Sequence, residues 1–172
     1  MVSRLSGNVN IVMYYGAGKY YQVRAYDDNG NVAKGVEVVF TFNGKTYKVK
    51  TNSSGYAKLK ISAKVGTYKI TATYKNFKVS NKITIKTVLI TKDKAVKKGK
   101  VLKFNVKLLN SAGKILKNKK VTIKFKGKTY KVKTNSKGIA TLKIKVNFKV
   151  GKYNIKTSYG TASVMNKITV KK

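Results

Sequence analysis

Apolar and polar side chains alternate over many short stretches of this chain. In residues 102–108, Leu102, Phe104 and Val106 are separated by lysine or asparagine side chains. Successive side chains of a β-strand point to opposite faces of a sheet, so this period of two predicts strands with one buried and one exposed face. No stretch shows a convincing helical period. The lysines therefore form the outward half of the pattern, where they also discourage pairing with other chains.

The alternating runs are short and are separated by turn sequences. In the first half of the chain these turns are DDNGN, FNGK, TNSSG, KVG and KNF. We predict about seven strands there, at residues 10–15, 20–26, 36–42, 45–51, 56–62, 67–74 and 79–86. Seven short runs rich in Val, Ile, Thr, Tyr and Phe favour an all-β protein with a sandwich architecture.

The chain also repeats itself. The ten residues GKTYKVKTNS occupy positions 44–53 and return at 127–136, 83 positions later. NKITIK returns as NKITVK after 85 positions, so the second copy contains a two-residue insertion near VNFKVG. An internal repeat of this length predicts two tandem domains of about seven strands each, residues 1–86 and 87–172.

Each half contains a tyrosine immediately after a turn. VGTYKI and VGKYNI place Tyr68 and Tyr153 at the start of the sixth strand. This pattern is typical of a tyrosine corner, in which the ring packs in the core and the hydroxyl ties the turn. We therefore expect structural roles for both tyrosines. The repeated Gly55 and Gly138 are expected to supply the positive φ of a turn.

The first half resembles a known family. MYYGAGKYYQVRAYDDNGNVAKGVEVVFTFNGKTYKVKTNSSGYAKLKI, then GTYKITATY and NKITIK, is similar to the immunoglobulin-like repeats of adhesin-like surface proteins from methanogenic archaea. The shared features are a Tyr-Tyr start, a D-x-N-G turn, a G-x-x-Y-x-x-x-T-N-x-x-G-x-A-x-L-x-I hairpin pair, a G-x-Y-x-I corner and a closing N-x-I-x-V. In the second half, LITKDKAVKKGK replaces the Tyr-Tyr segment.

This resemblance implies an exported, wall-associated protein built from stacked immunoglobulin-like β-sandwiches. The chain would be a two-module excerpt of it, which would explain why the sequence shows no leader, no anchor and no apolar run of about 20 residues. The implied location is extracellular, at the cell surface or wall. The implied partners are an anionic cell-wall polymer, a surface glycan or a partner cell, and neighbouring repeats of the parent chain.

Charge distinguishes the two halves. The chain has 40 Lys and Arg against four Asp and Glu, a net charge of +36. The first half carries +12 and the second +24, although one architecture does not require that difference. Such a surface attracts polyanions with a strong dependence on salt. We predict that the second half contacts anions through Lys131, Lys133, Lys143 and Lys145 on neighbouring strands.

Residues suited to catalysis are scarce. The chain has no Cys and no His, which removes thiolate and imidazole chemistry. Its only carboxylates are Asp27, Asp28, Glu37 and Asp93, and no acid is repeated in both halves. General acid–base catalysis and a glycosidase carboxylate pair are therefore unsupported. We expect no catalytic residue, no metal, no cofactor and no enzymatic activity.

Three alternatives remain open from the sequence. DDNGN offers clustered oxygens to Ca²⁺ at Asp27 and Asp28, but the same residues are ordinary turn formers. A Lys–Asn cross-link at Asn81 or Asn166 would need an inward lysine and a carboxylate such as Asp93.

The third alternative is a basic β-protein that binds nucleic acid by tracking phosphates. Four tyrosines fall on inward positions, where they would not stack on bases: Tyr47, Tyr68, Tyr130 and Tyr153. The sequence also contains no recognisable nucleic-acid-binding motif. We therefore favour a non-enzymatic adhesin or stalk module. Its individual lysine contacts would be worth ~0–1 kcal/mol, so attachment would need many of them.

Overall fold

The computed structural model describes residues 3–172, which form strands, turns and loops. The chain divides into two compact units, Met1–Lys86 and Thr87–Lys172, called unit 1 and unit 2 below. Among the described residues, no helix has the length and apolar character needed to cross a bilayer.

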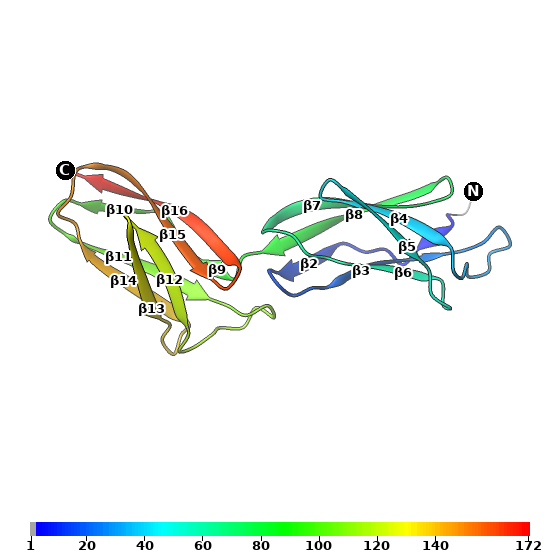
Figure 1. Ribbon diagram of the computed structural model, residues 1–172, viewed down its shortest axis with the longest axis horizontal. Coiled ribbons are helices and arrows are strands. Elements are labelled where there is room, and N and C mark those ends of the chain that lie inside the picture. Colours follow the sequence, from blue (N-terminus) through cyan, green and yellow to red (C-terminus); the bar gives the residue numbers. More distant parts are fainter. Residues whose placement is uncertain (1–2) are drawn as a thin grey trace. The chain divides into compact units, whose positions relative to one another are not determined.

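Unit 1 consists of a three-stranded and a five-stranded sheet (Figure 1). Its strands are β1 (Leu5–Ser6), β2 (Ile11–Tyr14), β3 (Tyr20–Ala25), β4 (Glu37–Phe42), β5 (Lys45–Lys50), β6 (Tyr56–Lys60), β7 (Gly66–Tyr74) and β8 (Phe77–Lys86). The strand orders are β1-β3-β6 and β2-β8-β7-β4-β5. Strand β2 runs parallel to β8, and the other paired strands are antiparallel.

Unit 2 repeats this arrangement. Its strands are β9 (Leu89–Ile90), β10 (Lys94–Lys97), β11 (Val101–Leu108), β12 (Lys120–Phe125), β13 (Lys128–Lys133), β14 (Ile139–Lys145), β15 (Gly151–Tyr159) and β16 (Ala162–Lys171). The sheets have the orders β14-β11-β9 and β10-β16-β15-β12-β13, and β10 runs parallel to β16.

Both units are immunoglobulin-like β-sandwiches, which confirms the predicted fold class. In each unit the chain passes from one sheet to the other five times, for example between β3 and β4, and the apolar side of each strand faces the opposite sheet. The fully buried side chains include Tyr21 and Phe40 in unit 1 and Phe104 and Ile123 in unit 2. The alternation of the sequence therefore fills one core per unit.

The predicted strands match the structure with one omission and one wrong pairing. Each of the seven runs predicted in the first half contains a strand, but the short β1 was not predicted. The start of the second half forms a strand, β10, despite the loss of the Tyr-Tyr segment. The hairpin expected between β5 and β6 does not exist, because β5 pairs with β4 and β6 pairs with β3.

The reason lies in the Thr-Asn dipeptide that follows β5. Thr51 is buried, and its Oγ1 donates to Ala33 O (2.7 Å) and accepts from Val36 N–H (3.0 Å). The Oδ1 of Asn52 then accepts from two backbone N–H groups in the next turn. These bonds direct the chain across to the other sheet, and Thr134 does the same in unit 2.

Candidate anion-binding surface

Lysine is the only abundant charged side chain, and every lysine of the chain is exposed. This confirms that lysine forms the outward half of the period-two pattern. It also leaves the proposed Lys–Asn cross-link without an inward lysine in residues 3–172. Instead, the Asn166 amide donates to the Asp93 carboxylate at 3.0 Å, and the Asn81 amide donates to Asn10 Oδ1 at 3.1 Å.

The four lysines chosen from the sequence lie on two edge strands. Lys131 and Lys133 are on β13, and Lys143 and Lys145 are on β14. These strands follow each other in the chain but belong to different sheets, because Thr134 starts a crossing rather than a hairpin. The two pairs of lysines therefore lie on different sheets, and their contact with an anion stays a prediction.

A larger group of lysines occupies the outward face of the five-stranded sheet of unit 2. We call this group the lysine face, and it consists of Lys120, Lys124, Lys131, Lys133, Lys152, Lys156, Lys167 and Lys171. The outward positions of these four strands carry no carboxylate. A surface of one charge sign raises the local concentration of an oppositely charged polymer.

Lysines in unit 2 also lie directly opposite one another on paired strands. The four pairs are Lys97–Lys171, Lys103–Lys143, Lys120–Lys133 and Lys124–Lys156. Side chains in such positions share a face and are close neighbours, and like charges there are destabilising. Unit 2 therefore retains repulsion that its own fold does not need.

The matching positions of unit 1 show how the repulsion is avoided. They are occupied by Tyr14–Lys86, Tyr20–Lys60, Glu37–Lys50 and Thr41–Thr71. Unit 1 has one lysine pair of its own, Lys69 opposite Lys82, where unit 2 has Asn154 opposite Lys167. Six of the twelve extra charges of unit 2 thus lie in these four cross-strand pairs, which can be recognised only when the strand register is known.

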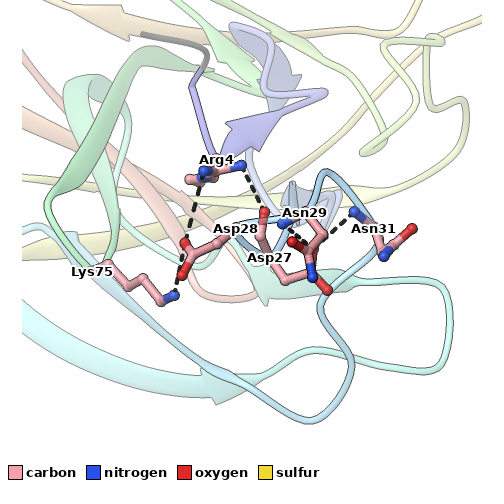
Figure 2. Close-up of polar contacts among 6 residues, drawn as sticks. All are labelled: Arg4, Asp27, Asp28, Asn29, Asn31 and Lys75. Carbon is pink, nitrogen blue, oxygen red and sulfur yellow. Dashed lines mark hydrogen bonds and ion pairs between the residues drawn. The ribbon is translucent and has the colours of Figure 1, made fainter.

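The acidic turn of unit 1 uses its carboxylates within the fold (Figure 2). Asp27 Oδ1 accepts from Asn29 N–H and Asn31 N–H, each at 2.9 Å. Asp28 lies 3.2 Å from Lys75 Nζ and 3.8 Å from an Arg4 nitrogen, two cations that would oppose a bound Ca²⁺.

The same turn in unit 2 needs no carboxylate. Asn110 replaces Asp27 and makes the equivalent bonds to Ala112 N–H and Lys114 N–H, each at 2.9 Å. The geometry therefore favours the turn interpretation over a calcium site. No group of three or more potential metal-ligating acidic, His or Cys side chains occurs within residues 3–172.

Tyr68 and Tyr153 are half-buried at the starts of β7 and β15. The Tyr68 hydroxyl donates to Lys64 O at 2.7 Å, and the Tyr153 hydroxyl donates to Lys149 O at 2.6 Å. The Tyr68 ring packs on Phe42, with ring centroids 5.3 Å apart. These bonds tie each strand to the connection that precedes it.

A polar cluster around the buried Tyr21 in unit 1 was not predicted from the sequence. Lys82 N–H donates to Asn10 Oδ1 at 2.9 Å, so Asn81 presents its Nδ2 to that oxygen. Asn81 Oδ1 then accepts from the Tyr21 hydroxyl and from Asn8 Nδ2, each at 2.6 Å. Burial raises the pKa of Tyr21 to about 12, although the hydrogen bond with Asn8 opposes this effect.

Unit 2 has a related cluster with three replacements, Thr91 for Asn8, Asp93 for Asn10 and Phe104 for Tyr21. Asp93 Oδ1 accepts from Lys167 N–H at 2.9 Å and from Asn166 Nδ2 at 3.0 Å. These bonds, the backbone one first, hold the pKa of Asp93 below its ordinary value. Phe104 lacks the hydroxyl of Tyr21 and Thr91 lacks the amide of Asn8, and Asn166 Oδ1 is buried without a hydrogen-bond partner in the described part of the chain.

The fold and the lysine face define a basic protein of tandem immunoglobulin-like domains. No family model matches the chain, and no curated protein matches its sequence.

Solved structures with similar folds include three multidomain proteins. The I9–I11 tandem from titin is 12% identical, with 96% of this chain and 64% of that chain covered and a TM-score of 0.48. Invasin, a bacterial integrin-binding protein, is 15% identical, with coverage of 97% and 38% and a TM-score of 0.40. Domains 4–9 of the surface layer protein SbsC are 19% identical, with coverage of 88% and 25% and a TM-score of 0.37. The chain spans less than two thirds of each of these proteins, and we draw no functional argument from them.

Proposed function

We propose that the chain is a non-enzymatic adhesive or stalk module of a cell surface, and that unit 2 attaches it to an anionic polymer. The observation that carries this proposal is the set of lysine pairs in unit 2, three of which lie on the outward face of its five-stranded sheet. Like charges on opposite strands cost stability, and a polyanion lying across them would relieve the repulsion. A neutral spacer would gain nothing from them.

The proposal extends to location and relatives. The Tyr-Tyr start, the D-x-N-G turn and the G-x-Y-x-I corner, together with the sandwich fold, support a place among the immunoglobulin-like repeats of adhesin-like surface proteins of methanogenic archaea. The module would then lie outside the cell, beside other repeats of a longer chain. Its ligand would be an anionic wall polymer, a surface glycan or a partner cell, contacted by Lys131, Lys133, Lys143, Lys145 and the rest of the lysine face.

The test is retention of the chain on three immobilised polyanions of matched charge density: polygalacturonate, heparin and duplex DNA. We expect retention on the polysaccharides at physiological salt, about 0.15 M, and a steep loss as salt rises. The variant Lys120→Glu/Lys124→Thr introduces unit 1 residues into the lysine face and should elute at lower salt. The control variant Lys48→Glu/Lys58→Thr makes the same charge change in unit 1 and should elute later than the unit 2 variant.

Two results would contradict the proposal. A chain that passes through every column at physiological salt would be a spacer without an attachment role. A chain that prefers DNA to heparin at matched charge would instead support the nucleic-acid-binding alternative.

A further inference from the structure

The two-residue insertion in unit 2 lengthens one strand pair and adds an aromatic side chain, Phe148, next to β15. It lengthens the pairing of β11 with β14, which adds the partners Leu102–Ile144 and Val101–Lys145. The inserted segment then places Phe148 beside the start of β15. The Phe148 ring meets Phe125 and Tyr153 edge to face, with ring centroids 5.8 Å and 5.0 Å apart.

A lysine is held against these rings. Lys126 Nζ lies 4.2 Å from the centroid of Phe148 and 4.7 Å from that of Tyr153. Both distances are within the range of a cation–π interaction, which fixes the ammonium group in place. Lys126 adopts a φ of +48°, and unit 1 has Asn43 at the matching position with a φ of +50°. Asn accepts this backbone conformation more readily than Lys, so Lys126 is retained at a conformational cost.

Next to this cluster is a hollow of about 300 Å³. Its charged lining consists of three exposed lysines, Lys126, Lys128 and Lys145, with no carboxylate. The remaining lining is apolar or neutral and is made by Phe125, Tyr130, Ile144, Asn147 and Phe148. The volume is at the lower end of the ~300–1,000 Å³ of small-molecule pockets.

Unit 1 lacks half of these groups, including two of the three lysines. Asn43 stands in place of Lys126, Ser62 stands in place of Lys145, and the first unit has no counterpart of the inserted Phe148. Of the three lysines that line the hollow, only Lys128 has a lysine, Lys45, at the matching position of unit 1. Half of the lining of the hollow therefore distinguishes unit 2 from an otherwise equivalent domain.

We propose that this hollow binds one acidic sugar residue, such as a uronate, of an anionic polysaccharide. The inference rests on the proposed anion-binding function of unit 2 and names the unit of the polymer that is recognised. Three ammonium groups suit a single acid group, while the Asn147 amide can both donate to and accept from ring hydroxyls. Ile144 and Tyr130 offer apolar surface to the C–H face of a pyranose.

The packing of the aromatic side chains favours a sugar over a nucleobase. Phe125, Phe148 and Tyr153 meet edge to face, and Lys126 lies over two of the rings. Bases stack on aromatic side chains whose ring faces are open. Here Lys126 lies over the rings of Phe148 and Tyr153, and the rings meet edge to face. A sugar ring needs only the apolar wall and the ammonium groups.

The test is an NMR titration of the full chain with trigalacturonate, with neutral maltotriose and a thymidine trinucleotide as comparison ligands. We expect saturable shifts of the Asn147 and Phe148 amide signals with trigalacturonate alone. Lys126→Asn/Lys145→Ser introduces the unit 1 residues and should weaken this binding about tenfold, as expected for loss of charge-assisted hydrogen bonds. Phe148→Ala should weaken it without any change of charge.

A matched variant separates the hollow from the lysine face. Lys124→Thr/Lys156→Thr also introduces unit 1 residues and removes two positive charges, as many as Lys126→Asn/Lys145→Ser removes. It should lower polymer retention but leave the affinity for trigalacturonate within about twofold of the wild-type value. Shifts spread evenly over the lysine face, or tighter binding of the trinucleotide, would overturn the inference. Polymer retention without a titration response at the hollow would overturn this inference alone, whereas loss of both would overturn the proposed function as well.

Discussion

Tyr21 and Phe104 occupy matching positions in the two units and differ by one hydroxyl group. That hydroxyl donates to Asn81 Oδ1 in unit 1, whereas Asn166 Oδ1 in unit 2 is left unpaired within residues 3–172. We expect Tyr21→Phe to lower the free energy of unfolding of unit 1 by about 0.5–1.5 kcal/mol, because Asn8 still donates to Asn81 Oδ1, and Phe104→Tyr to raise that of unit 2 by about 1 kcal/mol. Urea denaturation followed through amide signals of each unit measures both, and a zero effect of Tyr21→Phe would contradict the assigned bond.

Tyr21 also makes the stability of unit 1 depend on alkaline pH. Its pKa is raised from 10.0 to about 12, so the folded state disfavours the phenolate. The contribution of Tyr21 to the free energy of unfolding is fully present below pH ~10, the pKa of tyrosine in the unfolded chain. It is lost as the pH rises through about 12, the pKa in the folded state. Lysines and other tyrosines titrate nearby, so the measurement is the difference in denaturation midpoint between the wild-type chain and Tyr21→Phe. That difference should shrink across this window.

Two buried threonines of unit 2 should respond oppositely to truncation. Thr157 stands where unit 1 has Ala72, and its Oγ1 is buried without a partner in the chain from residue 3 onward. Thr134 Oγ1 donates to Leu116 O at 2.7 Å and accepts from Lys119 N–H at 3.0 Å. Thermal unfolding should show Thr157→Ala stabilising unit 2 by about 1 kcal/mol and Thr134→Ala destabilising it by a similar amount. Destabilisation by both would show that the Thr157 hydroxyl is satisfied.

At the scale of strands, the difference between the units lies in which charges share a face. Lys120 opposes Lys133 on β12 and β13, and unit 1 has Glu37 opposite Lys50. Lys120→Glu should therefore stabilise unit 2 by about 0.2–1 kcal/mol at low salt, with the gain fading as salt screens the pair. The reverse change, Glu37→Lys, should destabilise unit 1. Both are measured as shifts in urea midpoint at two salt concentrations.

The strands and the exposure of the lysines could be predicted because a period of two is a local property. In residues 102–108 it identifies buried and exposed positions without knowledge of any neighbouring strand. The crossing after Thr51 could not be predicted, because Thr-Asn also suits a hairpin and the bonds of Thr51 to Ala33 and Val36 are long-range.

The candidate site was less accessible to sequence reasoning for a related reason. Lys131 and Lys133 were found from their alternation, but the opposition of Lys124 to Lys156 depends on a register between strands far apart in the chain. The contact of Lys126 with the inserted Phe148 likewise joins two separate turns. The only sign of this contact in the sequence is that Lys126 stands in a turn where the first repeat has Asn43.

At the scale of the whole molecule, the two sandwiches should respond differently to salt. Unit 2 carries a net charge of +24 and unit 1 carries +12 on the same architecture. Screening relieves repulsion, so added NaCl should raise the unfolding midpoint of unit 2 more than that of unit 1. Amide signals assigned to each unit in a thermal series measure the two shifts. Equal shifts would show that the additional lysines of unit 2 do not repel one another appreciably.

The parallel pairing of the first long strand of each unit with its last strand has a mechanical consequence. Residues 11–14 run alongside residues 83–86, and residues 94–97 run alongside residues 168–171. When tension pulls the two ends of a unit apart, it slides such strands past each other along their length. The bonds between them then carry the load together instead of parting one by one. A domain joined in this way resists stretching along the line between its ends.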